Sequence, residues 1–489
     1  MLTKFEKDVA KMLLFFAFAI AACKFSNGIF GWVMAILGCY AALTRNAKWI
    51  CIFFVFTPLL IFFSPTLVSG AYLGPAIRIG QIMMLFCLLL SPIIRSRRDS
   101  IPIGVLYLYS LVALISSIDG WMPTISCLKV FNFVLFLMGI SVIGKIMQES
   151  EESLYQLRCV LLGLAFFIVV GSAIVYFIPS VGYSMEVQKA AIWGVYTSGA
   201  EVASREGKSL FNGVMNHSQT LATNVPMWFS WTLCDMLTNE RKPTKMHAVI
   251  MVIAPFLMYM SRSRTAFVVF VVSMFMIWLT VLPKIQLSSV LRDRVKMTFY
   301  CLIITIVAGL SYFQVRDQTI SKWLRKSDDV MGDSRGLIES VTESRMGLVE
   351  YNLRDFKLNP LLGKGFQVMD WHSAAYQSGQ ISLLSAPIEK GVMPLMVLGE
   401  TGIIGGIVFV VFLIVFYSMC LKYNYRCLMC LFTVLLAANM SEAGFFSPGG
   451  GTAQWTSTVI GGFCLDMIVK RRNNSYLKMR EWTGERVYG

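Results

Sequence analysis

Residues 246–283 read MHAVIMVIAPFLMYMSRSRTAFVVFVVSMFMIWLTVLP, which is two apolar runs separated by the polar junction Ser261-Arg262-Ser263-Arg264-Thr265-Ala266. Helices of roughly 17 to 25 apolar residues cross a hydrocarbon core of about 30 Å. The ten-residue alternation typical of a membrane barrel strand is not dominant anywhere in the chain. The stretch therefore predicts two neighbouring transmembrane helices that meet at a pair of arginines.

The rest of the chain extends this pattern. Of its 489 residues 56% are hydrophobic and 15% are charged, and the mean hydropathy of +0.64 is far above that of a soluble domain. We therefore expect an all-α polytopic integral membrane protein with about fourteen transmembrane helices, or twelve if the shortest candidates do not span. The candidate spans are 10–24, 28–44, 49–64, 74–95, 101–118, 126–147, 157–178, 217–238, 245–261, 264–283, 296–314, 391–419, 425–441 and 452–469.

The net charge of +15 is carried by short connectors between the apolar runs, so it indicates topology rather than nucleic-acid binding. Lys and Arg are enriched in cytoplasmic connectors. If the N-terminus is inside, every second connector carries the excess, and both termini are predicted to be cytoplasmic. The connector cations are Arg45, Lys48, Arg95, Arg97, Arg98, Lys145, Arg158, Arg241, Lys242, Lys245, Lys284, Arg292, Arg294, Lys422 and Arg426.

The predicted parity divides the chain into six parts. External connectors are expected at 179–216, 314–390 and 442–451. The six parts are N-terminal transmembrane helices at 1–178, an external loop at 179–216, transmembrane helices with the arginine junction at 217–313, a large external loop at 314–390, C-terminal transmembrane helices at 391–469 and a basic cytoplasmic tail at 470–489.

The loop 314–390 is long for a connector, and loops of this length are usually functional. Its segment Leu337 to Phe356 has apolar residues, Leu353 among them, at helical spacing, which predicts an amphipathic helix that lies over the mouth of the bundle. Asn359-Pro360 is expected to end that helix. Gly363-Lys364-Gly365 then predicts a flexible turn whose backbone amides can approach an anion.

Three arginines are the first candidates for anion binding. Arg262 and Arg264 lie at an external junction, where cations are the minority pattern, although they could also be a stop-transfer flank. Arg78 lies within the fourth span, near its external end, and could join them. The alternatives for Arg78 are snorkelling to the interface or pairing with an acidic neighbour.

The order of motifs between residues 205 and 420 resembles the O-antigen ligase and O-antigen polymerase superfamily of bacterial envelopes. The resemblance is carried by the arginine junction, by Arg345 followed by Asn359-Pro360-Leu361-Leu362-Gly363-Lys364-Gly365-Phe366, and by Leu398-Gly399-Glu400-Thr401-Gly402-Ile403-Ile404-Gly405. It implies a metal-independent glycosyltransferase of the GT-C type. Such an enzyme takes a glycan from an undecaprenyl diphosphate carrier on the periplasmic side of the bacterial cytoplasmic (inner) membrane.

The resemblance assigns Arg262, Arg264 and Arg345 to the diphosphate, by motif and spacing. Charge accumulates on that leaving group as the glycosidic bond breaks, and fixed guanidinium groups can stabilise it without a metal. No metal or other cofactor is expected, and the chain's histidines are too scattered in sequence for a metal site. The cysteines lie mostly in apolar runs, where thiols behave as small hydrophobes.

One feature of the ligases is absent. They carry a histidine at the start of the span that ends in Glu-x-Gly, where this chain has Glu389-Lys390-Gly391. The group that activates the acceptor is thus open among Glu389, Asp370, His372 and His217, with Glu389 first by position. Lys390 is better suited to bind phosphate, and Trp371 offers a face on which a sugar could stack, or is an interfacial Trp. His217 lies in a polar patch that could instead cap a helix, and Glu400 is expected to be structural, while the glycines after it are expected to serve close helix packing.

The missing histidine favours a polymerase that joins lipid-linked repeat units of an O-antigen or exopolysaccharide. A ligase that transfers the glycan to lipid A core is the alternative, and a lipid-linked oligosaccharide flippase is the candidate from another class. The expected partners are the undecaprenyl-diphosphate-linked glycan and membrane lipid, together with a flippase and a chain-length regulator implied by the resemblance. No nucleic acid is expected.

Overall fold

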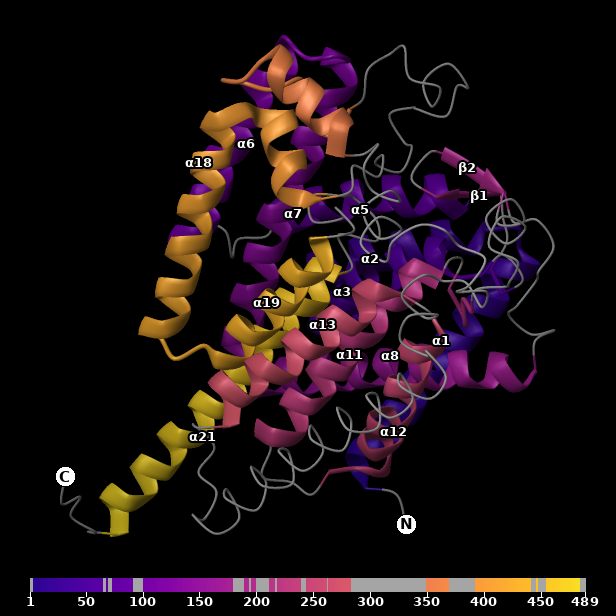
Figure 1. Cartoon of the computed structure of the whole chain (residues 1–489). Coiled ribbons are helices and arrows are strands. Elements are labelled where there is room, and N and C mark those ends of the chain that lie inside the picture. Colours follow the sequence, from indigo (N-terminus) through magenta and orange to yellow (C-terminus); the bar gives the residue numbers. More distant parts are fainter. Residues whose placement is uncertain are drawn as a thin grey trace, which may run out of the picture.

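The computed structural model describes residues 3–64, 67–68, 73–90, 100–178, 189–192, 195–198, 211–215, 218–238, 243–261, 263–282, 349–368, 392–440, 446 and 454–483. Within these ranges the chain is a bundle of helices, so the predicted helical class is confirmed (Figure 1). A two-stranded antiparallel hairpin of β1 (Lys189–Ile192) and β2 (Val195–Ser198) lies in the loop predicted at 179–216.

The first half of the bundle opens with a capped helix. The amide of Thr3 donates to Glu6 (2.8 Å), which lowers the pKa of that carboxyl, and the amide of Glu6 donates back to the Thr3 hydroxyl (3.2 Å). The elements of this half are α1 (Lys4–Phe25), α2 (Phe30–Thr44), α3 (Ala47–Cys51), η1 (Ile52–Phe56), α4 (Thr57–Leu59), η2 (Leu60–Phe62), α5 (Leu73–Leu89), α6 (Ile101–Ile118), α7 (Pro123–Glu149) and α8 (Glu151–Phe177).

The second half packs against α8 and α7. Its elements are α11 (Ser218–Thr238), α12 (Lys245–Met260), α13 (Arg264–Met276), η4 (Ile277–Val281), α18 (Met393–Lys422), α19 (Arg426–Asn439), η6 (Thr456–Ile460) and α21 (Gly461–Thr483). Helices α6 and α18 lie side by side at one edge of the bundle, and α13 and α11 both pack on α19 nearer its centre (Figure 1).

Five segments are long and apolar enough to cross a membrane: α6, α7, α8, α13 continued through η4, and α18. Five shorter apolar segments accompany them, namely α2, α3 to α4, α5, α12 and α19. The described residues therefore support a helical membrane protein without establishing the predicted number of spans. The predicted span 296–314 lies outside the described residues.

The connectors gather at two ends of the bundle. The first, which we call end A, is marked by Lys4, Gln148, Thr238 and Tyr423. Three contacts join parts of the chain at this end: the hydroxyl of Tyr155 donates to Asp8, Arg471 donates to the carbonyl of Gln148, and Arg472 donates to that of Thr238. Both described termini lie at this end, at the bottom of Figure 1.

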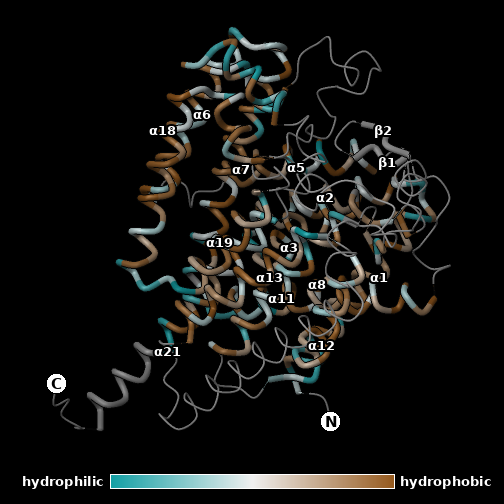
Figure 2. The backbone as a smooth tube through the Cα atoms, viewed as in Figure 1, coloured by the Kyte–Doolittle hydropathy of each residue, from teal (hydrophilic) through white to brown (hydrophobic). Residues whose placement is uncertain are grey.

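The opposite end, end B, holds the α6–α7 connector, residues 211–215, 359–368 and Phe446. Trp121 N donates to the carbonyl of Lys364 (3.0 Å), and Ser64 N donates to that of Val214 (2.7 Å). Hydrophilic residues are concentrated at the two ends and apolar ones along the helices (Figure 2). The connectors predicted to share one side of the membrane thus lie together, whereas the assignment of end A to the cytoplasm depends on the charge distribution alone.

Candidate functional site at end B

Helix α18 is bent sharply at Gly402, which has φ 65° and ψ −164°. An ideal Cβ at this position would lie 2.2 Å from the carbonyl oxygen of Leu361, so only glycine fits. The structure differs here from the expectation of a single straight span with packing glycines. Figure 1 shows the first segment of α18 rising to the bend and the second descending beside α6.

A bend in an apolar helix leaves backbone groups without intrahelical partners, and these are costly in a membrane. The segment 359–368, which we call the docked turn, supplies the missing partners. Lys364 N and Gly365 N donate to the carbonyls of Gly399 (2.9 Å) and Glu400 (3.2 Å), and Ile403 N donates to that of Pro360 (2.8 Å). The turn and the bend therefore stabilise each other.

The docked turn also binds to the connector between α6 and α7. Ser126 Oγ, which has a single proton to donate, lies 2.6 Å from Ser117 Oγ and 2.9 Å from the carbonyl oxygen of Phe366, and Lys129 Nζ donates to the carbonyl of Gln367 (2.8 Å). The Ser116 hydroxyl donates to the carbonyl of Glu400. Three distant parts of the sequence thus meet in one buried hydrogen-bond network.

This network corrects one sequence prediction. Gly363 and Gly365 do have positive φ, 72° and 105°, as a tight turn requires. Their amides, however, donate to Asn359 O (2.8 Å) and to Glu400 O, so they are engaged within the protein and not presented to an anion. Asn359 has a structural role as well, because its side chain accepts from Leu362 N (3.3 Å).

The helix before the docked turn is described from residue 349 to 358, and it ends at Asn359-Pro360 as predicted. Its buried face differs from the prediction. Asn352 and Asp355 are buried, while Leu353 is 37% exposed and Leu358 is 54% exposed. The reason is the surface it covers: Trp121 Nε1 donates to the carboxylate of Asp355 (3.3 Å), so end B presents polar groups to this helix.

Trp121 itself is a residue that the sequence reasoning missed. It is half-buried, and the Lys364 ammonium lies 5.3 Å from the centroid of its ring. Its position in a connector predicted to be external was the available signal, because an aromatic face beside a cation can stack a sugar.

Arg264 is the first residue of α13, and the first turn of that helix contains no acidic residue. A helix N-terminus carries a partial positive charge that favours anions, so an arginine there increases the positive potential at this junction. Because α12 begins at end A, the junction between α12 and α13 lies away from it, toward end B.

Arg78 is half-buried on α5, about five residues from the end B terminus of that helix. Among the residues that the structure describes, no hydrogen bond or ion pair is found for its guanidinium. Pairing with an acidic neighbour, one of the two alternative explanations, thus finds no support there. Gln81, one turn further along the same helix, is 6% exposed, and its amide nitrogen has no hydrogen-bond partner among the described residues.

The other predicted site residues lie outside the described residues. They are Arg262, Arg345, Glu389, Lys390, His372, His217 and Trp371. Asp370 lies outside as well. Their roles therefore stay predictions.

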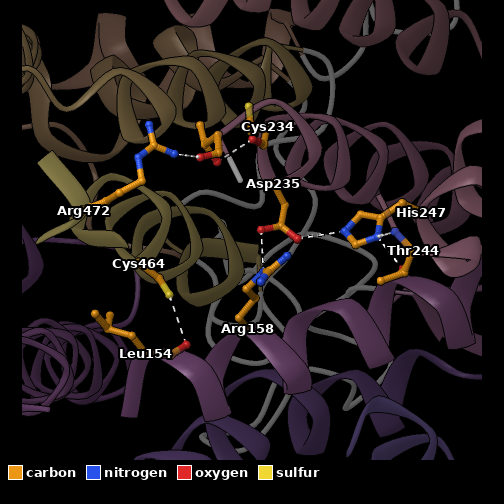
Figure 3. Close-up of polar contacts among 9 residues, drawn as sticks. Leu154, Arg158, Cys234, Asp235, Thr244, His247, Cys464 and Arg472 are labelled. Carbon is orange, nitrogen blue, oxygen red and sulfur yellow. Dashed lines mark hydrogen bonds and ion pairs between the residues drawn. The ribbon is translucent and has the colours of Figure 1, made fainter. Parts of the chain in front are cut away.

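A second polar cluster, at end A, was not predicted (Figure 3). Asp235 is fully buried; its carboxylate accepts from Arg158 Nε (2.7 Å) and lies 2.8 Å from His247 Nε2. Since the amide of Thr244 can only donate, His247 Nδ1 accepts from it (3.3 Å). The ring proton is therefore on Nε2, which donates a hydrogen bond to the Asp235 carboxylate. The cluster ties α8, α11 and α12 together.

This cluster has the character of a structural clamp. The Arg158 guanidinium is also covered by the ring of Phe5, at 4.4 Å from its centroid. Within the described ranges, no group of three or more His, Cys, Asp or Glu side chains comes together to hold a metal ion. The cations and aromatic face at end B are therefore the better candidate for ligand binding.

Comparison of the sequence with models of known protein families gives no match, and comparison with curated proteins gives none either.

Proposed function

We propose that this chain is a metal-independent membrane glycosyltransferase that joins glycan repeat units carried on undecaprenyl diphosphate into a longer O-antigen or exopolysaccharide. The observation that carries the proposal is Arg78, a half-buried guanidinium on an apolar helix without an ion pair in the described part of the chain. An arginine in this position is costly, and binding of a diphosphate would offset that cost.

Two further features support an anion of the diphosphate class. Arg264 adds its charge to the positive end of α13. A departing diphosphate gains negative charge in the transition state, and planar guanidinium groups can bind it in a bidentate way. By the sequence resemblance, Arg262 and Arg345 would complete this set.

The acceptor glycan needs a separate surface beside the cations. Trp121, with Lys364 over its ring, offers an aromatic face next to the docked turn. We propose that a sugar of the acceptor stacks there, while Glu389 accepts the proton of the attacking hydroxyl.

The test uses the purified full-length protein in vesicles, with a polyprenyl-diphosphate-linked repeat unit as donor and neither nucleotide sugar nor metal added. Elongated lipid-linked glycan is the expected product. Arg264→Ala and Arg345→Ala should each abolish it, whereas Arg426→Ala at end A, whose Nε donates to Asn424 (2.9 Å), should not.

Unchanged yield in both arginine variants would show that the diphosphate assignment is wrong. Transfer of glycan only to a lipid A core acceptor, without elongation, would identify the chain as a ligase. Movement of the donor across the bilayer without any transfer would support a flippase.

A further inference from the structure

A cleft of about 380 Å³ opens between the α6–α18 pair and the helices α7, α19 and η6. This volume is in the range of ordinary ligand pockets, about 300 to 1,000 Å³. Most of the lining is apolar. Leu106, Leu137, Phe412, Phe416, Trp455 and Val459 contribute its deeper part.

The cleft belongs to one half of the membrane. On α18 the lining runs from Phe412 to Tyr423, and Ser100 and Gln148 line its other walls at end A. The helical rise makes this distance roughly 16 Å. Because the hydrocarbon core is about 30 Å thick, the cleft has the depth of a single leaflet.

The end A side of the cleft is basic and aromatic. Lys145, only 7% exposed, is one of the lining residues, as are Tyr423 and Tyr425. The Lys470 ammonium lies 3.8 Å from the ring centroid of Tyr425, and that of Lys422 lies 5.4 Å from Tyr423. Among the residues that the structure describes, the lining includes no Asp or Glu.

Asp466 on α21 lies one turn before Lys470, and its carboxylate interacts electrostatically with that lysine. Asp466 accepts from the amides of Cys427 (3.0 Å) and Leu428 (2.9 Å) at the start of α19, and it is 4% exposed. Three lysines, namely Lys145, Lys422 and Lys470, thus stand against this one carboxylate, so the mouth of the cleft favours an anionic group, while the interior favours a hydrocarbon chain.

We propose that this cleft binds one phospholipid with an anionic headgroup, drawn from the leaflet at end A. An acyl chain lies between α6, α7 and α18, and the headgroup phosphate meets Lys145 and the lysines over the two tyrosines. Basic pockets between transmembrane helices are a common mode of anionic-lipid recognition. The site is separate from Arg78 and the docked turn, and it is independent of the proposed transferase activity.

A glycine in the wall provides the test. Gly144 lines the cleft, and a Cβ added there meets no atom within 4 Å, so the side chain in Gly144→Leu would occupy the space of the acyl chain. Gly104 on α6 is exposed, is not a lining residue and also has open space at its Cβ position, so Gly104→Leu is the matched control.

The full-length proteins would be reconstituted with equal amounts of phosphatidylglycerol and phosphatidylcholine, then released and weighed by native mass spectrometry. Wild type and Gly104→Leu should each retain one phosphatidylglycerol, and Gly144→Leu should retain none. Lys145→Met, which keeps the length of the side chain, should abolish the preference for phosphatidylglycerol over phosphatidylcholine.

The proposal is overturned if wild type retains no phospholipid, if it retains both lipids equally, or if a polyprenyl phosphate is retained in place of a phospholipid. If Gly144→Leu fails to fold, a second measurement that does not need this variant still tests whether the lipid occupies the cleft. Phosphatidylglycerol with brominated acyl chains should quench more tryptophan fluorescence in wild type than in Trp455→Phe, and equal quenching would contradict the site.

Discussion

The interactions that stabilise end A differ from those that stabilise end B. At end A, side-chain charges neutralise each other in the buried cluster of Arg158, Asp235 and His247. At end B, backbone amides and carbonyls of the docked turn complete the bend at Gly402, and serine hydroxyls fix the turn to α6 and α7.

The difference has a consequence for ligands. A buried cluster whose charges satisfy each other has little left to offer an external anion. End B is built mainly from backbone hydrogen bonds, and Arg78 is without an ion pair in the described part of the chain. Stability at end A should therefore depend on charge, and stability at end B on backbone geometry.

The largest loss of stability is expected from Asp235→Ala at end A. It leaves the Arg158 guanidinium buried without its carboxylate, which costs roughly 3–5 kcal/mol in comparable cases. The thermal unfolding midpoint in detergent measures it. Lys11→Ala removes an ion pair to Asp8 from a side chain that is 71% exposed, leaves the hydrogen bond from Tyr155 to Asp8 in place, and should have a much smaller effect. Equal losses in both variants would remove the contrast between buried and exposed charge.

The next largest effect is expected from Gly402→Ala at end B. The added methyl group meets the carbonyl of Leu361, and alanine is strained at φ 65°, so a cost of about 1–3 kcal/mol is expected. Gly406→Ala lies in the regular part of the same helix and should be neutral or slightly stabilising. Protease cleavage within the docked turn should increase only in the first variant. Protection of the turn in Gly402→Ala would show that the bend does not depend on glycine.

A smaller effect, about 1 kcal/mol, is expected from Ser126→Ala, which removes the bonds to Ser117 and to the carbonyl of Phe366. Ser110→Ala on α6 is the control, because that hydroxyl donates within its own helix to Leu106 O (2.8 Å). The unfolding midpoints should separate the two. If Ser110→Ala costs as much, the hydroxyls at end B have no special role.

The smallest change in stability is expected from Arg78→Gln, within about 0.5 kcal/mol, because no ion pair in the described part of the chain is broken. Transfer activity should nevertheless fall by about 100-fold if the guanidinium binds the diphosphate. The same vesicle assay and the unfolding midpoint give both values. A large drop in the midpoint would mean that Arg78 has a structural partner instead.

The sequence was informative where hydrophobicity and charge act locally. The apolar runs predicted the helices, and the spacing of Lys and Arg predicted which connectors lie together. Contacts between distant segments could not be predicted from the sequence. Arg158 was interpreted only as a topology signal, because Asp235 is 77 positions away and the pairing depends on how α8 packs against α11.

The glycines show the same limit. Three of them follow one another closely at 402, 405 and 406, and all suit close helix packing by sequence. Only Gly402 bends the helix, because the carbonyl of Leu361 reaches it from another part of the chain. Likewise, the turn at Gly363 and Gly365 was predicted. The hydrogen bond from Gly365 N to Glu400 O was not, because it depends on the bend in α18 that packs against the turn.

The bend at Gly402 also changes how α18 is counted. Met393 to Thr401 is a short re-entrant segment, and only the residues after the bend are long enough, at about 30 Å, to cross the hydrocarbon. A reporter fused just before Met393 and one fused just after the bend would thus sample the same half of the bilayer. A hydropathy plot instead treats the two positions as successive points along a single crossing.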